Sequence, residues 1–277
     1  MKHLSQDMKK LSDYSYNVYS QFGEDGIIET LFSVIGTISK ICIEFGAWDG
    51  FRFSNTANLW TKGWKGILIE ANKAKYKELL RNTAGYDCHC IAAVVSYAGE
   101  NTLENILRMW NLPREIDFLS IDIDGDDYFV FESLREIRPR VIACEYNPTI
   151  PPHMELVAEP GNYFGCSPLS LVKLAETKGY RLIALTDTNC FFVLEADFDK
   201  FHGYETSLGS LAITKYLTYL LSGYSGDYLA SREPIYGCSH RSTQRFFRGN
   251  GFRIPRENNI NPLVRRLLRI IRRTQNS

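Results

Sequence analysis

Four short apolar runs in the first 150 residues each lead into a carboxylate. The four acids are Glu44, Glu70, Asp122 and Glu145. Runs of this length and composition are typical of strands buried in a parallel sheet. Parallel strands present their carboxyl ends at one edge, where open α/β sheets bind ligands, so we expect these side chains to lie together there.

The first two runs predict a βαβ unit that binds a nucleoside. Glu44 is followed by Gly46 and Gly50, and glycine can adopt a positive φ and let a ligand approach the backbone closely. Glu70 ends the second run, twenty-odd residues further on, at a spacing that fits a carboxylate accepting the two hydroxyls of a ribose. Each such charge-assisted hydrogen bond is worth about 1.5–3 kcal/mol when shielded from water.

Two other segments are predicted to border this pocket. Gln21 precedes an amphipathic helix whose first turn contains Glu24 and Asp25. Helix-end electrostatics is one reading of this turn, and a place for Gln21 beside the nucleoside is the other. After the glycines, Ser54 or Asn55 is placed to cap a helix and to aim backbone amides at a carboxylate.

Acids are densest around the fourth run, which contains Asp117, Asp122, Asp124, Asp126 and Asp127. Such a cluster is costly unless it is solvated or holds a cation. Asp122 stands at the tip of the predicted strand, where we expect it to orient a cofactor amine or an acceptor hydroxyl.

Two further roles are predicted near these strand tips. Asp122, Glu145 and Asn147 would converge hard oxygen ligands on a divalent ion such as Mg²⁺. The alternative is that the acids only cap loops and bind the cofactor. His153 follows the fifth strand and is either a general base or a solvated loop residue.

The order of elements predicts an α/β fold. Strands expected at 41–45, 66–70, 91–95, 116–122 and 140–147 alternate with helices, among them 72–83. A helix at 167–178 precedes two more strands, 180–185 and 190–194, around a turn. We expect a catalytic domain over residues 1–200 and an extension over 201–277 whose role the pattern does not declare.

Composition narrows the classes of function. Lys plus Arg and Asp plus Glu number 32 each, so the chain as a whole has no charge that favours nucleic acid. The apolar content of 44% suits a buried core. The N-terminus has no signal-peptide pattern and no apolar run is as long as a membrane span, so we expect a cytoplasmic protein.

The cysteines favour a reducing compartment. They number seven, an odd count, and several lie in apolar runs, as expected of reduced and buried thiols. Cys88, His89 and Cys90 form the only close group. No second pair stands at metal-ligand spacing, so a plain strand is preferred to a zinc site.

The C-terminal segment is basic. From Phe252 onward it has seven arginines against one glutamate, a local net charge of +6. Residues 261–273 predict an amphipathic helix with leucines and isoleucines on one face and arginines on the other. This helix would lie on the anionic inner face of a membrane, or dock on the domain or on a second subunit of a homo-oligomer.

Five motifs taken together resemble the FkbM-like group of class I S-adenosylmethionine-dependent methyltransferases. They are Ser20-Gln21-x-Gly23-Glu24-Asp25, Glu44-x-Gly46-x-x-x-Gly50, Ser54-Asn55-Thr56, Gly63-Trp64-x-Gly66-Ile67-x-Ile69-Glu70 and Ile116-Asp117-Phe118-Leu119-x-Ile121-Asp122-x-Asp124-Gly125. The resemblance covers roughly Tyr14 to Asp197.

The resemblance implies a mainly parallel, seven-stranded Rossmann-like sheet with helices on both faces. It also implies S-adenosylmethionine as cofactor, with Glu44 and the segment from Gly46 to Gly50 near its methionine part and Glu70 on its ribose. The implied reaction is O-methylation of a sugar or another small biosynthetic intermediate. Two departures are Trp48, in place of a middle glycine, and the acidic turn that follows Asp122, in place of Glu-Gly-Glu.

Other functions share parts of this pattern. Asp122-Ile123-Asp124-Gly125 resembles the Asp-x-Asp-Gly of haloacid-dehalogenase-type phosphatases, in which the first acid is the nucleophile and the second the general acid. Asp-x-Asp also occurs in metal-dependent glycosyltransferases. A third alternative is an inactive methyltransferase-like fold that acts as a binding or scaffold module.

Overall fold

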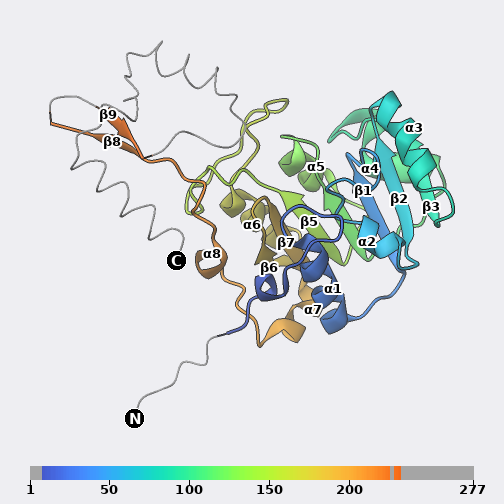
Figure 1. Cartoon of the computed structure of the whole chain (residues 1–277), viewed down its shortest axis with the longest axis horizontal. Helices are drawn as coiled ribbons and strands as arrows, with labels where there is room; N and C mark the ends of the chain where they lie inside the picture. The colour runs from blue at the N-terminus through green and yellow to red at the C-terminus, as the bar shows by residue number, and fades with distance from the viewer. Residues whose placement is uncertain (1–7, 225–227, 232–277) are drawn as a thin grey trace. The chain divides into compact units, whose positions relative to one another are not determined.

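The computed structural model describes residues 8–224 and 228–231 (Figure 1). The chain divides into two compact units, residues 1–213 and 214–277. The boundary that we predicted at residue 200 lies somewhat before this division. The second unit contains an antiparallel pair of strands, β8 (Leu220–Ser222) and β9 (Tyr228–Ala230). The predicted amphipathic helix at 261–273 lies outside the described residues.

The first unit is built on a seven-stranded sheet in the order β3-β2-β1-β4-β5-β7-β6. The strands are β1 (Ile41–Phe45), β2 (Lys65–Glu70), β3 (Cys88–Ala92), β4 (Phe118–Ile121), β5 (Val141–Glu145), β6 (Tyr180–Leu185) and β7 (Asn189–Leu194). Strands β1 to β5 pair in parallel, and β7 runs antiparallel to both β5 and β6. The prediction of a mainly parallel, seven-stranded Rossmann-like sheet is confirmed.

Helices cover both faces of the sheet. The α-helices of this unit are α1 (Glu24–Ile35), α2 (Ala57–Trp60), α3 (Lys73–Asn82), α4 (Leu103–Met109), α5 (Asp127–Ser133), α6 (Pro168–Thr177), α7 (Glu195–Phe198) and α8 (Leu208–Leu211). The 3-10 helices are η1 (Leu11–Tyr14), η2 (Gly99–Asn101) and η3 (Asp199–Phe201). Buried side chains of α4, α5 and α6 share one apolar core with the sheet, and those of α1, α2 and α3 share the other.

Alternation along each strand supplies both cores. Ile41, Ile43 and Phe45 of β1 belong to the core under α4, α5 and α6, whereas Cys42 belongs to the opposite core. All five residues of β1 are buried, which explains why the run is almost continuously apolar. The one acid in it, Glu44, therefore needs partners inside the protein.

The helices predicted at 72–83 and 167–178 are present as α3 and α6, and each is capped by a polar residue at its start. The Asn72 side chain accepts hydrogen bonds from the backbone of Ala74 and Lys75 at the start of α3. Ser167 caps α6 in the same way and is followed by Pro168 in the first turn, a position that suits proline.

The third strand begins earlier than we predicted from the run at 91–95. Gly66, Ile67 and Leu68 of β2 pair with residues 88–90, so Cys88-His89-Cys90 forms the first part of β3. The strand was displaced in the prediction because its first residues are less apolar than those that follow.

One acid that the sequence grouped with the cluster lies at the opposite edge of the sheet. Asp117 precedes β4, whereas Asp122 follows it, so the strand separates them. Fully buried Asp117 accepts hydrogen bonds from the backbone N–H groups of residues 38–40 and from Arg140 at 3.0 Å. Asp117 therefore does not belong to the predicted ligand edge.

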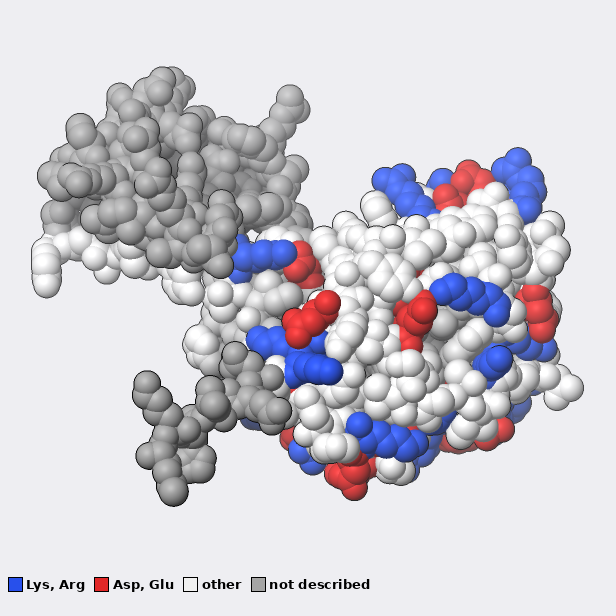
Figure 2. Space-filling view, turned by 60° about the horizontal axis from the view of Figure 1, so that its bottom comes forward, with Lys and Arg blue, Asp and Glu red and all other residues white. Residues whose placement is uncertain are grey.

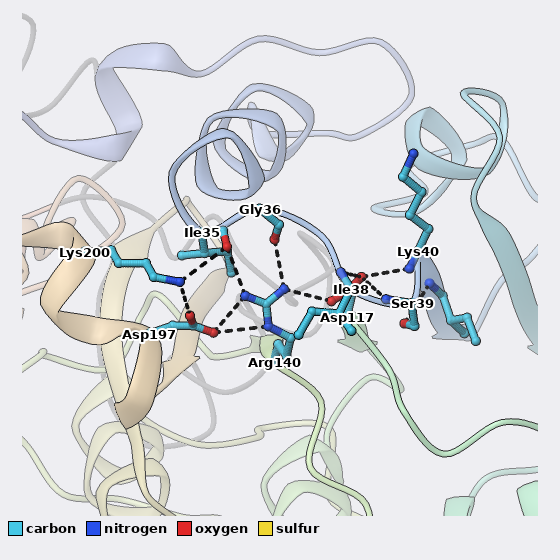
Figure 3. A network of polar contacts seen from close by, with 10 residues as sticks. Ile35, Gly36, Ile38, Ser39, Lys40, Asp117, Arg140, Asp197 and Lys200 are labelled. Atoms are coloured by element: carbon cyan, nitrogen blue, oxygen red, sulfur yellow. Dashed lines mark hydrogen bonds and ion pairs between the residues drawn. The ribbon is translucent and has the colours of Figure 1, made fainter.

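Arg140 is the centre of this second polar network (Figure 3). Its guanidinium also donates to Asp197 and to the carbonyl oxygens of Ile35 and Gly36. Lys200 completes the network through Asp197 at 2.6 Å. The network thus joins the end of α1 to the amino-terminal edge of the sheet, where β1, β4 and β5 begin.

The surface of the first unit carries both signs of charge. On the face drawn in Figure 2, Lys and Arg are interspersed with Asp and Glu. Within the described ranges, 8–224 and 228–231, no helix has the length and apolarity needed to cross a membrane.

Candidate active site at the carboxyl edge of the sheet

The four predicted carboxylates come from adjacent strands. Glu44 lies near the end of β1, Glu70 ends β2, Asp122 directly follows β4 and Glu145 ends β5. These strands are neighbours in the order β2-β1-β4-β5 and are mutually parallel. The strand order reverses at β1, which makes the space between β1 and β4 a switch point of the kind that binds ligands in open α/β sheets.

Gly46 turns the chain directly beneath this edge. Its φ is +73°, and a Cβ at this position would lie 2.5 Å from the carbonyl oxygen of Asp122. No side chain fits in that space, so the backbone after β1 packs against the backbone after β4. Gly50 has φ +91°, and a Cβ there would meet Leu79 at 2.8 Å. Both predicted glycines are thus required by the loop itself.

Trp48 holds the position where many class I enzymes carry a middle glycine. It adopts φ +50°, an unfavourable conformation for a large side chain, and the residue is 42% exposed. The Lys75 ammonium lies 4.7 Å from the ring centroid, within the range of a cation–π contact. The loop is thereby stabilised without the glycine.

Glu70 fastens this loop to the next helix. One carboxylate oxygen accepts the Trp48 backbone N–H at 2.7 Å, and the other accepts that of Asn72 at 2.6 Å. Asn72 caps α3, so Glu70 joins two loops at the edge. Each oxygen has a second acceptor position, which leaves the carboxylate able to bind a diol.

Glu44 is engaged by the segment before α2. Its carboxylate accepts hydrogen bonds from Ser54 Oγ at 2.5 Å, Thr56 Oγ1 at 2.7 Å and the backbone N–H of Asn55 at 2.8 Å. Burial raises the pKa of Glu44, and these three bonds oppose the rise. We predicted that backbone amides here point at a carboxylate. In the structure that carboxylate is the side chain of Glu44. The Asn55 side chain donates to Ser120 Oγ of β4.

The start of α1 brings more buried acceptors to the same region. Glu24 accepts hydrogen bonds from Thr186 Oγ1 at 2.8 Å and from Asn189 Nδ2 at 3.3 Å. Asn189 lies opposite Glu145 in the antiparallel ladder of β5 and β7. Asp25 accepts four hydrogen bonds through one oxygen, from residues 18–20. Gln21 is exposed beside this turn.

Two of these acceptors have no donor. Asp25 Oδ1 and Asn189 Oδ1 are both buried, and neither has a hydrogen-bond partner within the described part of the chain. Buried polar atoms in native proteins are nearly always satisfied, so each such atom calls for an explanation. A ligand that carries N–H or O–H groups would supply the missing donors.

Three acids meet at the tips of β4 and β5. Carboxylate oxygens of Asp122, Asp127 and Glu145 all lie within 4.8 Å of one another. Burial raises the pKa of Asp122, and the nearby charge of Asp127 raises it further. Burial and the charge of Asp122 act in the same way on Glu145. The cluster therefore favours bound protons or a bound cation.

Asp127 is the member that the sequence did not assign to the site. It is the first residue of α5, is buried, and accepts the backbone N–H groups of Ile123 and Gly125 at 2.9 Å. Asp124 and Gly125 both adopt positive φ and turn the chain back, which places Asp127 beside Asp122. The Asp-Gly step was the available signal, because it indicates such a turn.

The other two predicted residues lie in the segment after β5. Asn147 uses its side-chain oxygen to accept hydrogen bonds from Thr149 N and Oγ1, at 2.9 and 2.6 Å, and its amide donates to the Phe164 carbonyl. Asn147 thus holds its own loop. His153 is exposed in this loop and is not one of the three side chains that meet.

Comparisons with known proteins give fold-level likeness only. No family model matches the chain, and no curated protein matches it. Among solved structures, the glycopeptide N-methyltransferase MtfA complexed with S-adenosyl-L-methionine is 14% identical, with 64% of this chain and 91% of that chain covered and a TM-score of 0.38. A putative O-methyltransferase from Klebsiella pneumoniae is 13% identical, with 60% and 77% covered and a TM-score of 0.39.

The CMeT domain of the citrinin polyketide synthase is 11% identical, with 61% of this chain and 50% of that chain covered and a TM-score of 0.42. Likeness at this level does not establish a function. The resemblance to the FkbM-like group therefore stays a prediction, and the function of the chain is argued from its own site.

Proposed function

We propose that this protein is an S-adenosylmethionine-dependent methyltransferase that methylates an oxygen of a small molecule. The observation that carries the proposal is the glycine loop after β1. This loop packs without space for a Cβ against the backbone of Asp122 and is joined by Glu70 to the start of α3, at the switch point of the sheet.

The residues present fit this cofactor. Glu70 retains acceptor positions for the two ribose hydroxyls, and the bare backbone at Gly46 admits a close ligand. The two buried acceptors without donors, Asp25 Oδ1 and Asn189 Oδ1, suit the ammonium of a methionine moiety. When bound, the cofactor supplies a methyl group on a sulfonium.

The chain has to position the acceptor and receive its proton. The methyl group would pass from the bound cofactor to the acceptor oxygen, with the electron pair of the carbon–sulfur bond left on sulfur. The hydroxyl proton passes to the ionised form of Asp122. Because burial raises the pKa of Asp122 to about 8, this form is a stronger base than an ordinary aspartate, and its share increases as the pH rises toward 8. Alignment of the acceptor supplies most of the rate. His153 is the second candidate base.

The same cluster is the place for a divalent ion. Asp122, Asp127 and Glu145 offer three hard oxygen ligands, of the kind that Mg²⁺ prefers. Asn147, which we also predicted as a ligand, is engaged by Thr149. Acidic groups of this kind are common without an ion, so the metal is tested together with the cofactor.

The phosphatase alternative is less well supported. It would make Asp122 a nucleophile toward phosphate. No Lys or Arg that could bind a phosphate is present in segment 116–134, which contains Asp122, or in segment 141–167, which includes Glu145 and the loop after it. A sugar or other small biosynthetic intermediate remains our proposed acceptor, and cytoplasmic location remains an expectation.

Calorimetric titration with S-adenosylhomocysteine tests the proposal, with and without Mg²⁺. We expect saturable binding that weakens by about tenfold in Glu70→Gln, since one charge-assisted hydrogen bond is lost. Glu176→Gln, an exposed glutamate of α6, is the matched control and should bind as the unchanged chain does. Absence of binding under every condition would refute the enzyme and favour a scaffold.

A further inference from the structure

The segment between β5 and α6 forms a hairpin beside the acidic cluster. Val157 and Cys166 form an antiparallel bridge. On one side of it the Ala158 N–H donates to the Gly165 carbonyl at 2.9 Å, and on the other the Ser167 N–H donates to the Leu156 carbonyl at 2.8 Å. The hairpin is part of the yellow-green loop near α5 in Figure 1. It is an ordered element with its own hydrogen bonds.

The tip of this hairpin is fixed to the turn after β4. The Gly161 N–H donates to Asp126 Oδ1 at 2.7 Å. Gly125 has φ +132°, and a Cβ there would lie 2.7 Å from the Asn162 carbonyl oxygen and 3.1 Å from Tyr163 Cα. The two backbones therefore touch between the acids of the cluster and the hairpin tip.

The tip carries two aromatic side chains that pack poorly against the protein. Tyr163 is 86% exposed and Phe164 is 48% exposed, although the Phe164 carbonyl is held by Asn147 at 2.8 Å. Rings on an anchored backbone lose little conformational freedom when they contact a ligand. Aromatic side chains are also the usual apolar surface of ligand sites.

The two chain segments that form the cluster and the hairpin carry Asp and Glu but no Lys or Arg, and Lys173 of α6 pairs with one of their acids, Glu155. These segments are 116–134 and 141–167. An anionic acceptor would be repelled here, whereas hydroxyl or ammonium groups would find acceptors.

We propose that this hairpin selects the methyl acceptor, which is a ring-bearing molecule that carries hydroxyl or ammonium donors and no negative charge. The ring lies against Tyr163 and Phe164, and its donors face the carboxylates at the strand tips. This inference rests on the proposed methyltransferase function and adds the chemical class of the acceptor to it.

Methyl transfer from labelled S-adenosylmethionine into fractionated cell extract tests the inference. Low-mass compounds are first separated on an anion exchanger into a flow-through without negative charge and a retained anionic fraction. We expect label in the flow-through, lowered about tenfold in the double variant Tyr163→Ala and Phe164→Ala. Ile38→Ala removes an exposed apolar side chain near the opposite edge of the sheet and should retain full transfer. A cation exchanger then distinguishes hydroxyl-bearing from ammonium-bearing products.

A charge variant provides a second readout. Asp124 is exposed with φ +57°, a conformation that asparagine tolerates, so Asp124→Asn removes one negative charge with little strain. We expect this variant to raise the share of label found in the anionic fraction. Label mainly in the anionic fraction with the unchanged chain would overturn the inference, as would full transfer by the double aromatic variant.

Binding of S-adenosylhomocysteine separates the two proposals. The aromatic variants should bind it as the unchanged chain does, because their rings serve the acceptor. A chain that binds S-adenosylhomocysteine but labels neither fraction overturns the acceptor class and leaves the cofactor pocket standing. A chain that does not bind it at all refutes the proposed function itself.

Discussion

At the scale of single residues, the motif side chains act first on the protein itself. Glu44 and Glu70 have the positions expected of cofactor ligands, yet each already accepts hydrogen bonds from neighbouring loops. Glu44 has three donors on its two oxygens, whereas Glu70 has one on each. Glu70 is therefore the better candidate for direct contact with a ligand.

Gly46→Ala tests the close packing beneath the site. An alanine at positive φ costs about 1–2 kcal/mol, and the new Cβ would also clash with the Asp122 carbonyl. Gly99→Ala is the matched control, because Gly99 has φ +76° and open space around a Cβ. Urea unfolding should show Gly46→Ala less stable than Gly99→Ala by about 2 kcal/mol. Equal losses would mean that the two loops do not touch.

Asp122→Asn should change how stability depends on pH. The pKa of Asp122 is raised to about 8 by burial and by the charge of Asp127. A carboxyl whose folded pKa lies above its unfolded value stabilises the fold below the unfolded pKa and loses that contribution as pH rises through the folded pKa. Relative to the unchanged chain, the asparagine variant should therefore gain stability between about pH 4 and about pH 8. A constant difference across this range would contradict the raised pKa of Asp122.

Added Mg²⁺ distinguishes an ion site from a shared proton in the same experiment. If the cluster binds the ion, millimolar Mg²⁺ should stabilise the unchanged chain near pH 8 and leave Asp122→Asn unaffected. If both proteins respond alike, no ion binds at Asp122.

At the scale of elements, the sequence shows which acids lie near a strand but not which of them meet at the same edge of the sheet. Asp117 and Asp122 are five positions apart, yet they lie on opposite sides of β4. Asp127 is equally far along the chain from Asp122 and lies beside it, because the turn at Asp124 and Gly125 reverses direction. Apolar runs therefore predicted the strands well, whereas membership of the cluster depended on turn geometry.

Arg140→Met tests the network at the amino-terminal edge. Removing the guanidinium leaves Asp117 and Asp197 without their buried partner, and breaking such a pair costs about 3–5 kcal/mol. Arg181→Met, which breaks the exposed contact with Glu195, should cost under about 1 kcal/mol. Urea unfolding measures both. A small loss in Arg140→Met would show that the network does not support the fold.

At the scale of the whole molecule, the apolar runs predicted the strands and placed Glu44, Glu70, Asp122 and Glu145 at one edge of a parallel sheet. The mainly parallel arrangement of seven strands was implied by the resemblance, and the structure has it. Two features could not be predicted from the sequence: the donors that bind Glu44, and the contact of the hairpin with the turn at Gly125. Both come from loops, and the complete fold decides which other residues a loop contacts.

The most direct test of the central claim is a crystal structure of the full chain with S-adenosylhomocysteine. We predict that the ligand lies across the ends of β1 and β4, over Gly46, with its ribose hydroxyls on Glu70 and its ammonium near Asp25 and Asn189. A ligand bound elsewhere, or bound without contact to Glu70 and the glycine loop, would contradict the assignment of this edge as the cofactor site.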